Sequence, residues 1–436
     1  MSKVFRPWTP DEAWLLPPSV LDFVPAGHPA HVVRELVREE FDLSAIMAAY
    51  SEPKGYPPYH PAMMVALLLY AYSRGVYSSR RIARACEERL DFQAITALNR
   101  PDFRTVSEFR RRHLDALAGL FVQVLKLCRQ AGLVGLGHVA VDGTKLKANA
   151  SKHKAMSYAR MVTAEAELSR DVEEWLTRAE QEDAADDARH GADRRADETP
   201  DWMRDKQARL ARIRAAKAEL EAQARAAAAA KADPPPGPDG TPRAPRGCKP
   251  KHSPGTPKLT AQRNFTDPES RIMLGGDGFI QGYNGQAAVD AQTQIIVAHR
   301  LTSDASDQDG LLALLDATEA NTGEMPDEVS ADAGFCCEAN LEGLVQRSVR
   351  GYVATGRASR PDGGKRGGPC VQAMRARLRR GGYRTRYRLR KQVVEPVFGQ
   401  IKQARSFRQF LLRGIDKVKA EWAMICMAHN LTKLRK

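Results

Sequence analysis

The sequence has few cysteines and no apolar run long enough to cross a membrane. Its seven cysteines are odd in number and lack the paired spacing of a zinc site, and Cys336 and Cys337 are adjacent. We therefore expect free thiols in a reducing cytoplasm. The N-terminus shows no charged-then-apolar secretion pattern, and the longest apolar stretch, around Met63–Ala71, is far shorter than a bilayer span. These absences predict a soluble cytoplasmic protein without a membrane partner.

Positive charge is abundant and unevenly distributed. The 436 residues, enough for two or three domains, carry a formal net charge of +14. From Val371 to Lys436 there are eighteen Lys or Arg against three acids, so this segment alone carries +15. The rest of the chain is close to neutral. The C-terminal segment therefore predicts contact with a polyanion, and with it association with the nucleoid.

Residues 1–135 have the pattern of a helical domain. An apolar helix is expected over His60–Tyr72, opened by Pro61. A second helix is expected over Ser78–Leu90, with four arginines, and a third over Thr105–Gln130, where Thr105 and Glu108 match a capping box. Such helices suit either a helix-turn-helix-like module that touches DNA through Ser78–Leu90 or a bundle that supports the next domain, and both alternatives stay open.

Residues 151–259 interrupt the domain that follows. From Ser151 to about Lys231 the sequence is rich in Ala and charged residues and nearly without Gly, which favours long solvated helices. One arrangement compatible with this composition is a helical hairpin broken near Glu198–Pro200. Pro234–Lys258 is rich in Pro, Gly and Lys and is expected to be an extended connector. We expect this insertion to project from the core and to add no strand to the main sheet.

Strand patterns lie on both sides of the insertion. Expected strands cover Gly137–Ala148 before it, and Gly282–Asp290, Gln294–Leu301, Glu328–Asp332 and Gly351–Thr355 after it. Helices are expected over Gln308–Glu319, Arg386–Gln403 and Lys417–Lys433. This order predicts an α/β domain with a mixed sheet, made of residues 136–150 and 260–436 and interrupted after its first strand by the helical insertion.

Two aspartates follow apolar strand residues. Asp142 stands in VAVDG and Asp332 in VSADAG, each with a Gly within two residues. A lone Asp before Gly is more often a turn residue than a catalytic one. An unpaired charge directly after an apolar strand is costly, however, and a divalent cation removes that cost. Carboxylates at strand ends are also where a site is expected in an α/β sheet.

A third acid, Glu395, stands in the most basic part of the chain. It is the only acid between Asp362 and Asp416. Pro396 indicates that the regular helix begins at Glu395 or kinks there. By spacing alone, Glu395 reads as a surface acid paired with nearby arginines.

The chain resembles insertion-sequence transposases of the DDE class, in the group with a ribonuclease-H-like catalytic domain and an N-terminal helical domain. The resemblance covers nearly the whole chain, and its specificity comes from several motifs in the family's order. These motifs are Gly55–Pro61, Ser78–Arg81 and Pro101–Arg110 in the N-terminal part, and VAVDGTKLKANAS (139–151), GYNGQAAVD (282–290), ADAGF (331–335) and VEPVFGQIK (394–402) in the catalytic part.

The resemblance implies that Asp142, Asp332 and Glu395 are the catalytic triad and hold Mg²⁺, for which Mn²⁺ can substitute. It also implies that Tyr387, Arg390 and Lys402 belong to the signature around the third acid. Four residues separate Arg390 from Glu395, one more than in related transposases, and Lys391 would fit the shorter spacing. The expected DNA contacts are Lys145, Arg384, Arg386, Tyr387, Arg388, Arg390 and Lys402.

The implied function is binding of a mobile element's inverted-repeat ends, metal-dependent strand cleavage by water, and joining of the 3′ hydroxyl to target DNA. A homodimer is the expected active complex. Two alternatives stay open: a ribonuclease-H-like nuclease that cuts without joining, and a non-catalytic DNA-binding descendant of a transposase.

Overall fold

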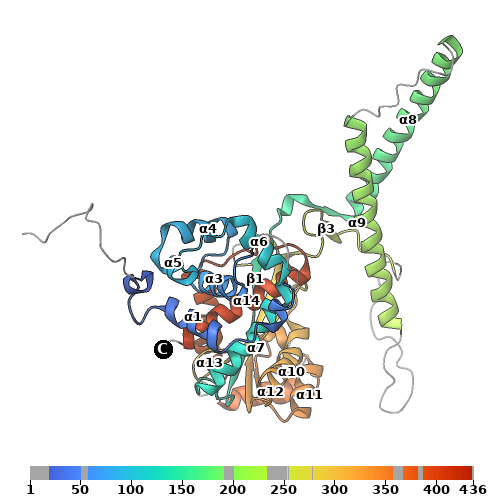
Figure 1. The fold of residues 1–436 in the computed structure, drawn as a ribbon. Coiled ribbons are helices and arrows are strands. Elements are labelled where there is room, and N and C mark those ends of the chain that lie inside the picture. Colours follow the sequence, from blue (N-terminus) through green and yellow to red (C-terminus); the bar gives the residue numbers. More distant parts are fainter. Residues whose placement is uncertain are drawn as a thin grey trace, which may run out of the picture.

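The computed structural model describes residues 19–50, 57–190, 201–232, 253, 255–276, 278–356, 367–381 and 386–434. Arg384, the break expected near Glu198–Pro200 and most of the connector Pro234–Lys258 lie outside the described residues. The described part is a mixed α/β structure with a helical N-terminal part and a mixed sheet (Figure 1). None of its described helices has the length and apolar character needed to cross a membrane.

The regular elements described in the N-terminal part are all helices, as the sequence predicted. Its elements are η1 (Val20–Phe23), α1 (Pro29–Glu39), α2 (Ser44–Met47), α3 (Pro61–Ser73), α4 (Ser79–Glu88), α5 (Leu90–Thr96), α6 (Phe103–Arg112) and α7 (Leu114–Gln130). In α3, Pro61 occupies the first turn and the His60 side chain accepts a hydrogen bond from the Ala62 N–H. Because α3 is apolar on all sides, it is buried almost along its whole length.

The helix start expected at Thr105 is wrong. Helix α6 begins at Phe103, because the Asp102 carboxylate accepts hydrogen bonds from the N–H groups of Arg104 and Thr105. Glu108, expected to complete a capping box, pairs instead with Arg111. The chain then breaks at His113 before α7, so the single long helix is two helices.

The main sheet has six strands with β1 in its middle. The strands are β1 (Val139–Lys147), β4 (Arg271–Gly275), β5 (Gly278–Asp290), β6 (Ile296–Thr302), β7 (Glu328–Ala331) and β8 (Arg350–Val353). β1 is antiparallel to β5 and parallel to β7, which is parallel to β8. β4 and β6 pair with different halves of the long β5. All five expected strands are present, whereas β4 was not expected.

Helices connect and cover these strands. They are η3 (Gln308–Gly310), α10 (Leu311–Thr322), η4 (Ala333–Phe335), α11 (Glu338–Gln346), α12 (Pro369–Gly381), η6 (Arg386–Arg388), α13 (Leu389–Gly399), the π-helical turn η7 (Gln400–Ala404) and α14 (Ile415–Leu434). Of the two alternatives at Pro396, a helix start at Glu395 is wrong, because α13 begins at Leu389 and runs through Pro396. Pro396 cannot donate to the Gln392 carbonyl, and the Gln294 side chain donates to it instead.

Helix α14 joins the N-terminal helices to the sheet. It packs against α3 and α7 as well as against β6, and its residues Ala420–Leu431 are all buried. Its Asn430 side chain bonds both the N–H and the carbonyl of Ile296 in β6. The N-terminal helices and the sheet therefore share one continuous apolar core.

The insertion is a helical hairpin that stands away from this core. α8 (Tyr158–His190) and α9 (Asp201–Ala232) lie side by side and project from the rest of the molecule (Figure 1). A separate apolar cluster that includes Met161 and Ile213 holds them together. At the base of the hairpin β2 (Ala155–Ser157) pairs with β3 (Gln262–Asn264) in a sheet of two strands. Within the described residues the insertion adds no strand to the main sheet, as the sequence predicted.

Candidate active site

Asp142 and Asp332 lie side by side where two parallel strands part. The pairing of β1 with β7 ends at Val141 and Ala331, and Asp142 and Asp332 are the residues that directly follow these two. Asp142 lies within β1, since β1 continues to Lys147 against β5. Asp332 follows the end of β7, where its carboxylate accepts a hydrogen bond from the Gly334 N–H at 2.9 Å. Strand register therefore places both carboxylates at one edge of the sheet.

Helix α13 carries both Glu395 and Arg390, and Arg390 links Glu395 to Asp142. The helix packs against β1, β5 and β7. Arg390 Nη1 donates to Asp142 Oδ2 at 2.6 Å, and Nη2 donates to Glu395 Oε1 at 3.2 Å. Glu395 is thus paired with an arginine, as spacing alone suggested. The same guanidinium also contacts Asp142, so Glu395 belongs to the group at the sheet edge.

Burial shapes the electrostatics of this group. The pKa of Asp142 is raised to about 6, first because the carboxylate is buried and further because Asp332 and Asp307 are close. The Arg390 guanidinium and the Gly143 N–H act in the opposite direction. Burial alone would lower the pKa of Arg390, but Asp142, Tyr387 and Asp332 together raise it. The site therefore concentrates negative charge around one buried cation.

The expected DNA contacts occupy different surroundings. Lys145 Nζ pairs with Asp307 at 3.1 Å, and Lys402 Nζ donates to the Lys145 carbonyl at 3.2 Å. Tyr387 lies beside Arg390. Arg386 pairs with the nearly buried Glu328 at 2.8 Å, away from the three acids. Arg388 lies in η6, and Arg384 is outside the described residues.

Asp307 is a site residue that the sequence reasoning missed. It comes from the loop between β6 and η3, and its carboxylate accepts hydrogen bonds from Lys145, Asn284 and Gln286. The loop Ser303–Asp309 contains three aspartates and no motif that distinguishes the inward one. The only available sign was the presence of Asn284 and Gln286 in GYNGQ, which now prove to hold Asp307.

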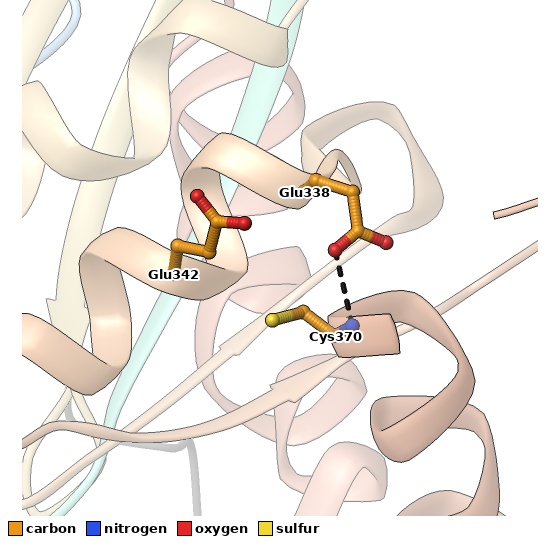
Figure 2. A group of neighbouring side chains, drawn as sticks. All are labelled: Glu338, Glu342 and Cys370. Atoms are coloured by element: carbon orange, nitrogen blue, oxygen red, sulfur yellow. Dashed lines mark hydrogen bonds between the residues drawn. The ribbon is translucent and has the colours of Figure 1, made fainter. Parts of the chain in front are cut away.

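A second group of possible metal ligands lies in α11 and α12. Among the described residues, Glu338, Glu342 and Cys370 bring their ligand atoms within 4.8 Å of one another, more tightly than Asp142, Asp332 and Glu395 do. Glu338 points to the start of α12 and accepts a hydrogen bond from the Cys370 N–H at 3.0 Å (Figure 2). It also accepts a hydrogen bond from the Val371 N–H at 3.1 Å. These bonds satisfy helix N–H groups, so the position of Glu338 is explained by capping.

Family comparisons give two matches at opposite ends of the chain. Residues 18–112 match a transposase domain, and residues 369–435 match a transposase DDE domain that contains Arg390, Glu395 and Lys402. Comparison with curated proteins and with solved structures found no match.

The matches define a class of protein. A transposase DDE domain implies a nuclease or transferase activity on DNA, and such domains generally depend on divalent metal ions. Between the two matched segments lie the strands that carry Asp142 and Asp332. The two matches, at opposite ends of the chain, support an insertion-sequence DDE transposase.

Proposed function

We propose that this transposase binds the inverted-repeat ends of its element, cleaves DNA strands by metal-dependent hydrolysis and joins the 3′ hydroxyl to target DNA. The observation that carries the proposal is that three acids from three separate segments surround one arginine, Arg390. Asp142 and Asp332 directly follow Val141 and Ala331, which pair across the adjacent strands β1 and β7. Arg390 connects Glu395 to Asp142. Asp142, Asp332 and Glu395 are the proposed catalytic residues.

The catalytic domain is proposed to be ribonuclease-H-like, built from residues 136–150 and 260–436. The strand order supports this assignment: β6, β5 and β1 are successively antiparallel, and β7 and β8 continue parallel to β1. In this reading residues 151–259 form the insertion after the first strand, and residues 1–135 form the N-terminal domain.

The three acids suit Mg²⁺, with Mn²⁺ able to substitute, because carboxylate oxygens are the ligands that both ions accept. The surroundings fit a cation as well. The buried Asn284 Oδ1 has no hydrogen-bond partner, and it lies 3.1 Å from the position that a Cβ on Gly143 would take. Bound divalent ions would activate the attacking oxygen and stabilise the leaving one.

The chain's own cations would hold the DNA. Arg390 neutralises Asp142 and Glu395, and we propose that it turns to a phosphate oxygen when DNA and cations occupy the site. Tyr387 and Lys402 would orient the same strand, and Lys145 would extend the contact along β1. Arg384, Arg386 and Arg388 are proposed to continue this track at the start of α13.

The helical parts are proposed to bring DNA and subunits together. In α4, Arg80, Arg81 and Arg84 are exposed, which favours a DNA contact over mere support of the sheet. A homodimer is the proposed active complex. The projecting hairpin of α8 and α9 would serve either dimerisation or contact with the element end.

The test uses the full chain, a labelled duplex with the inverted repeat that flanks its gene, and a plasmid target in Mg²⁺. Nicks that leave a 3′ hydroxyl at the element end, followed by plasmid-joined label, are the expected products. Cleavage without joining would favour the nuclease alternative. Specific binding of the end without any cleavage would favour a non-catalytic descendant.

A further inference from the structure

The carboxylate of Asp307 is a fourth acid in the immediate surroundings of Asp142 and Asp332. Its Oδ2 lies 3.5 Å from the position that a Cβ on Gly334 would take, and Asp332 Oδ1 lies 3.1 Å from the same position. Its Oδ1 lies 2.4 Å from the Cβ position of Gly143, the residue after Asp142. Its side chain is 18% exposed, so solvent screens it only partly. Nothing in the proposed triad requires this acid, and its burial beside two others is costly unless something offsets the charge.

Fixed donors orient the Asp307 carboxylate. Oδ1 accepts hydrogen bonds from Asn284 Nδ2 at 2.6 Å, Gln286 Nε2 at 3.1 Å and Lys145 Nζ at 3.1 Å. Oδ2 accepts a hydrogen bond from Lys145 Nζ at 3.3 Å. Three donors thus hold one oxygen in place, while the other retains capacity for a further contact.

Two glycines keep the space around this carboxylate open. A Cβ on Gly143, the residue after Asp142, would lie 2.4 Å from Asp307 Oδ1 and 3.1 Å from Asn284 Oδ1. A Cβ on Gly334 would lie 3.1 Å from Asp332 Oδ1 and 3.5 Å from Asp307 Oδ2. The glycines that follow the two aspartates of the triad therefore both border Asp307, and a side chain at either would intrude between the acids.

An unused buried oxygen points into the same space. Asn284 is fully buried, and its Nδ2 is committed to Asp307, which fixes the orientation of the amide. Its Oδ1 has no hydrogen-bond partner. A buried amide oxygen without a partner costs about 1–3 kcal/mol. A cation or a donor at this position would remove the cost, and amide oxygens are ordinary ligands of hard divalent cations.

A purely structural ion pair between Asp307 and Lys145 explains only part of this arrangement. It accounts for Lys145 but not for the unpartnered Asn284 Oδ1. This ion pair also leaves an excess of negative charge in the site. Four negative charges, from Asp142, Asp332, Glu395 and Asp307, face the two positive charges of Arg390 and Lys145. Two negative charges among these six side chains match one divalent cation.

We propose that Asp307 is a fourth carboxylate ligand of the divalent-cation site, with the Asn284 amide oxygen beside it. The inference rests on the proposed function, because it assumes that Asp142 and Asp332 hold the cation. Lys145 then competes with the cation for Asp307 and is released toward DNA phosphate when the cation binds.

The first experiment measures binding of Mn²⁺ to the full chain by electron paramagnetic resonance, without DNA. Asp307→Asn keeps an oxygen for the three donors and removes only the charge, and we expect a loss of Mn²⁺ affinity of about tenfold or more. The matched control is Asp309→Asn, an exposed acid two residues away, which should bind Mn²⁺ as the unaltered chain does. Unchanged affinity in Asp307→Asn would overturn the proposal.

A second variant separates direct ligation from a charge effect through space and replaces the first if that variant fails to fold. Asp307→Cys places a thiolate at the same position, and Cd²⁺ bound to it should give sulfur-to-metal charge-transfer absorption beyond that of the unaltered chain and of Asp309→Cys, which share the native cysteines and set the baseline. A folded Asp307→Cys variant that binds Cd²⁺ without the extra absorption would show that residue 307 does not touch the ion.

Asp142→Asn keeps the two proposals distinguishable. If Asp142→Asn loses Mn²⁺ and cleavage while Asp307→Asn retains both, the fourth ligand is wrong and the proposed function stands. If the unaltered chain binds no Mn²⁺ and cuts no DNA, the proposed function fails, and the inference fails with it.

Discussion

Arg390 joins Asp142 to Glu395, with Nη1 2.6 Å from Asp142 Oδ2 and Nη2 3.2 Å from Glu395 Oε1. The arginine and Asp142 side chains are each 14% exposed, whereas Glu395 is 46% exposed. The contact with Asp142 is therefore the stronger one, because water screens it less. One guanidinium supplies the positive charge that keeps two of the three acids together.

Arg390→Gln should destabilise the fold and make the stability depend on metal. The substitution leaves Asp142 without its cation in a poorly solvated site, at a cost of about 2–3 kcal/mol. Mn²⁺ should restore much of this loss, since it can neutralise the same carboxylate, and should stabilise the variant more than the unaltered chain. Thermal unfolding with and without Mn²⁺ measures both effects. Equal melting temperatures without metal would contradict this account.

Gly143→Ala should impair cleavage more than stability. The new Cβ would meet Asp307 Oδ1 at 2.4 Å and Asn284 Oδ1 at 3.1 Å, so the acids must shift. We expect a loss of roughly 1–3 kcal/mol in the free energy of unfolding and a cleavage rate below detection. Gly119→Ala on the exposed side of α7 is the matched control, because nothing lies within 4 Å of its added Cβ. Normal cleavage by Gly143→Ala would mean that the space is not needed.

Patterns local in the sequence predicted much of this structure. The apolar residues before Asp142 and Asp332 predicted β1 and β7, and composition predicted the hairpin of α8 and α9. What could not be predicted depends on distant partners. Helix α13 passes through Pro396 because Gln294, 98 residues before Gln392 in the sequence, bonds the free Gln392 carbonyl.

In the candidate active site, too, local sequence patterns predicted some residues, whereas contacts between distant residues could not be predicted. The strand residues around Asp142 and Asp332 indicated two acids, and their register now places them side by side. Asp307 was hidden because Asn284, Gln286 and Lys145 reach it from two other strands. The pairing of Arg390 with Asp142 was hidden for the same reason, because 248 residues separate the two.

Glu421 should make the stability of the fold depend on pH. Burial raises the pKa of this carboxyl to about 7, although the N–H groups of Leu412 and Leu411 and the nearby Arg110 oppose the shift. Because the pKa is higher in the folded state, the stabilising contribution is full below about pH 4.5 and is lost as pH rises through 7. Between pH 5 and 8 the free energy of unfolding should fall by roughly 2–3 kcal/mol more than in Glu421→Gln.

Urea unfolding of both chains at pH 5 and pH 8 measures this difference. Both chains retain His429, whose pKa burial lowers to about 3, so the gain in stability that this ring gives as pH rises from about 3 to 6.5 cancels in the comparison. Identical pH dependence in the two chains would refute the assignment to Glu421.

Binding to DNA should weaken steeply with salt, because residues 371–436 carry eighteen Lys or Arg against three acids. Arg379 and Arg380 are exposed in the last turn of α12, whereas Arg386 is engaged with Glu328. Replacing both Arg379 and Arg380 by Gln should lower the slope of log affinity against log salt by about one to two. Filter binding over a salt series measures the slope, with exposed Lys126→Gln on α7 as the control. A slope that does not change would remove α12 from the DNA contact.

Asp142, Asp332 and Glu395 are proposed to hold the catalytic cations, and the decisive measurement is cleavage of a duplex that carries the element's own end. Asp142→Asn, Asp332→Asn and Glu395→Gln keep the shape of each side chain and remove its charge. Each variant should show no cleavage in Mg²⁺ or Mn²⁺ while binding the end within about threefold of the unaltered chain. Near-normal cleavage by any one of them would remove that acid from the site. Loss of end binding in all three would show that the acids serve the fold and contradict the catalytic account.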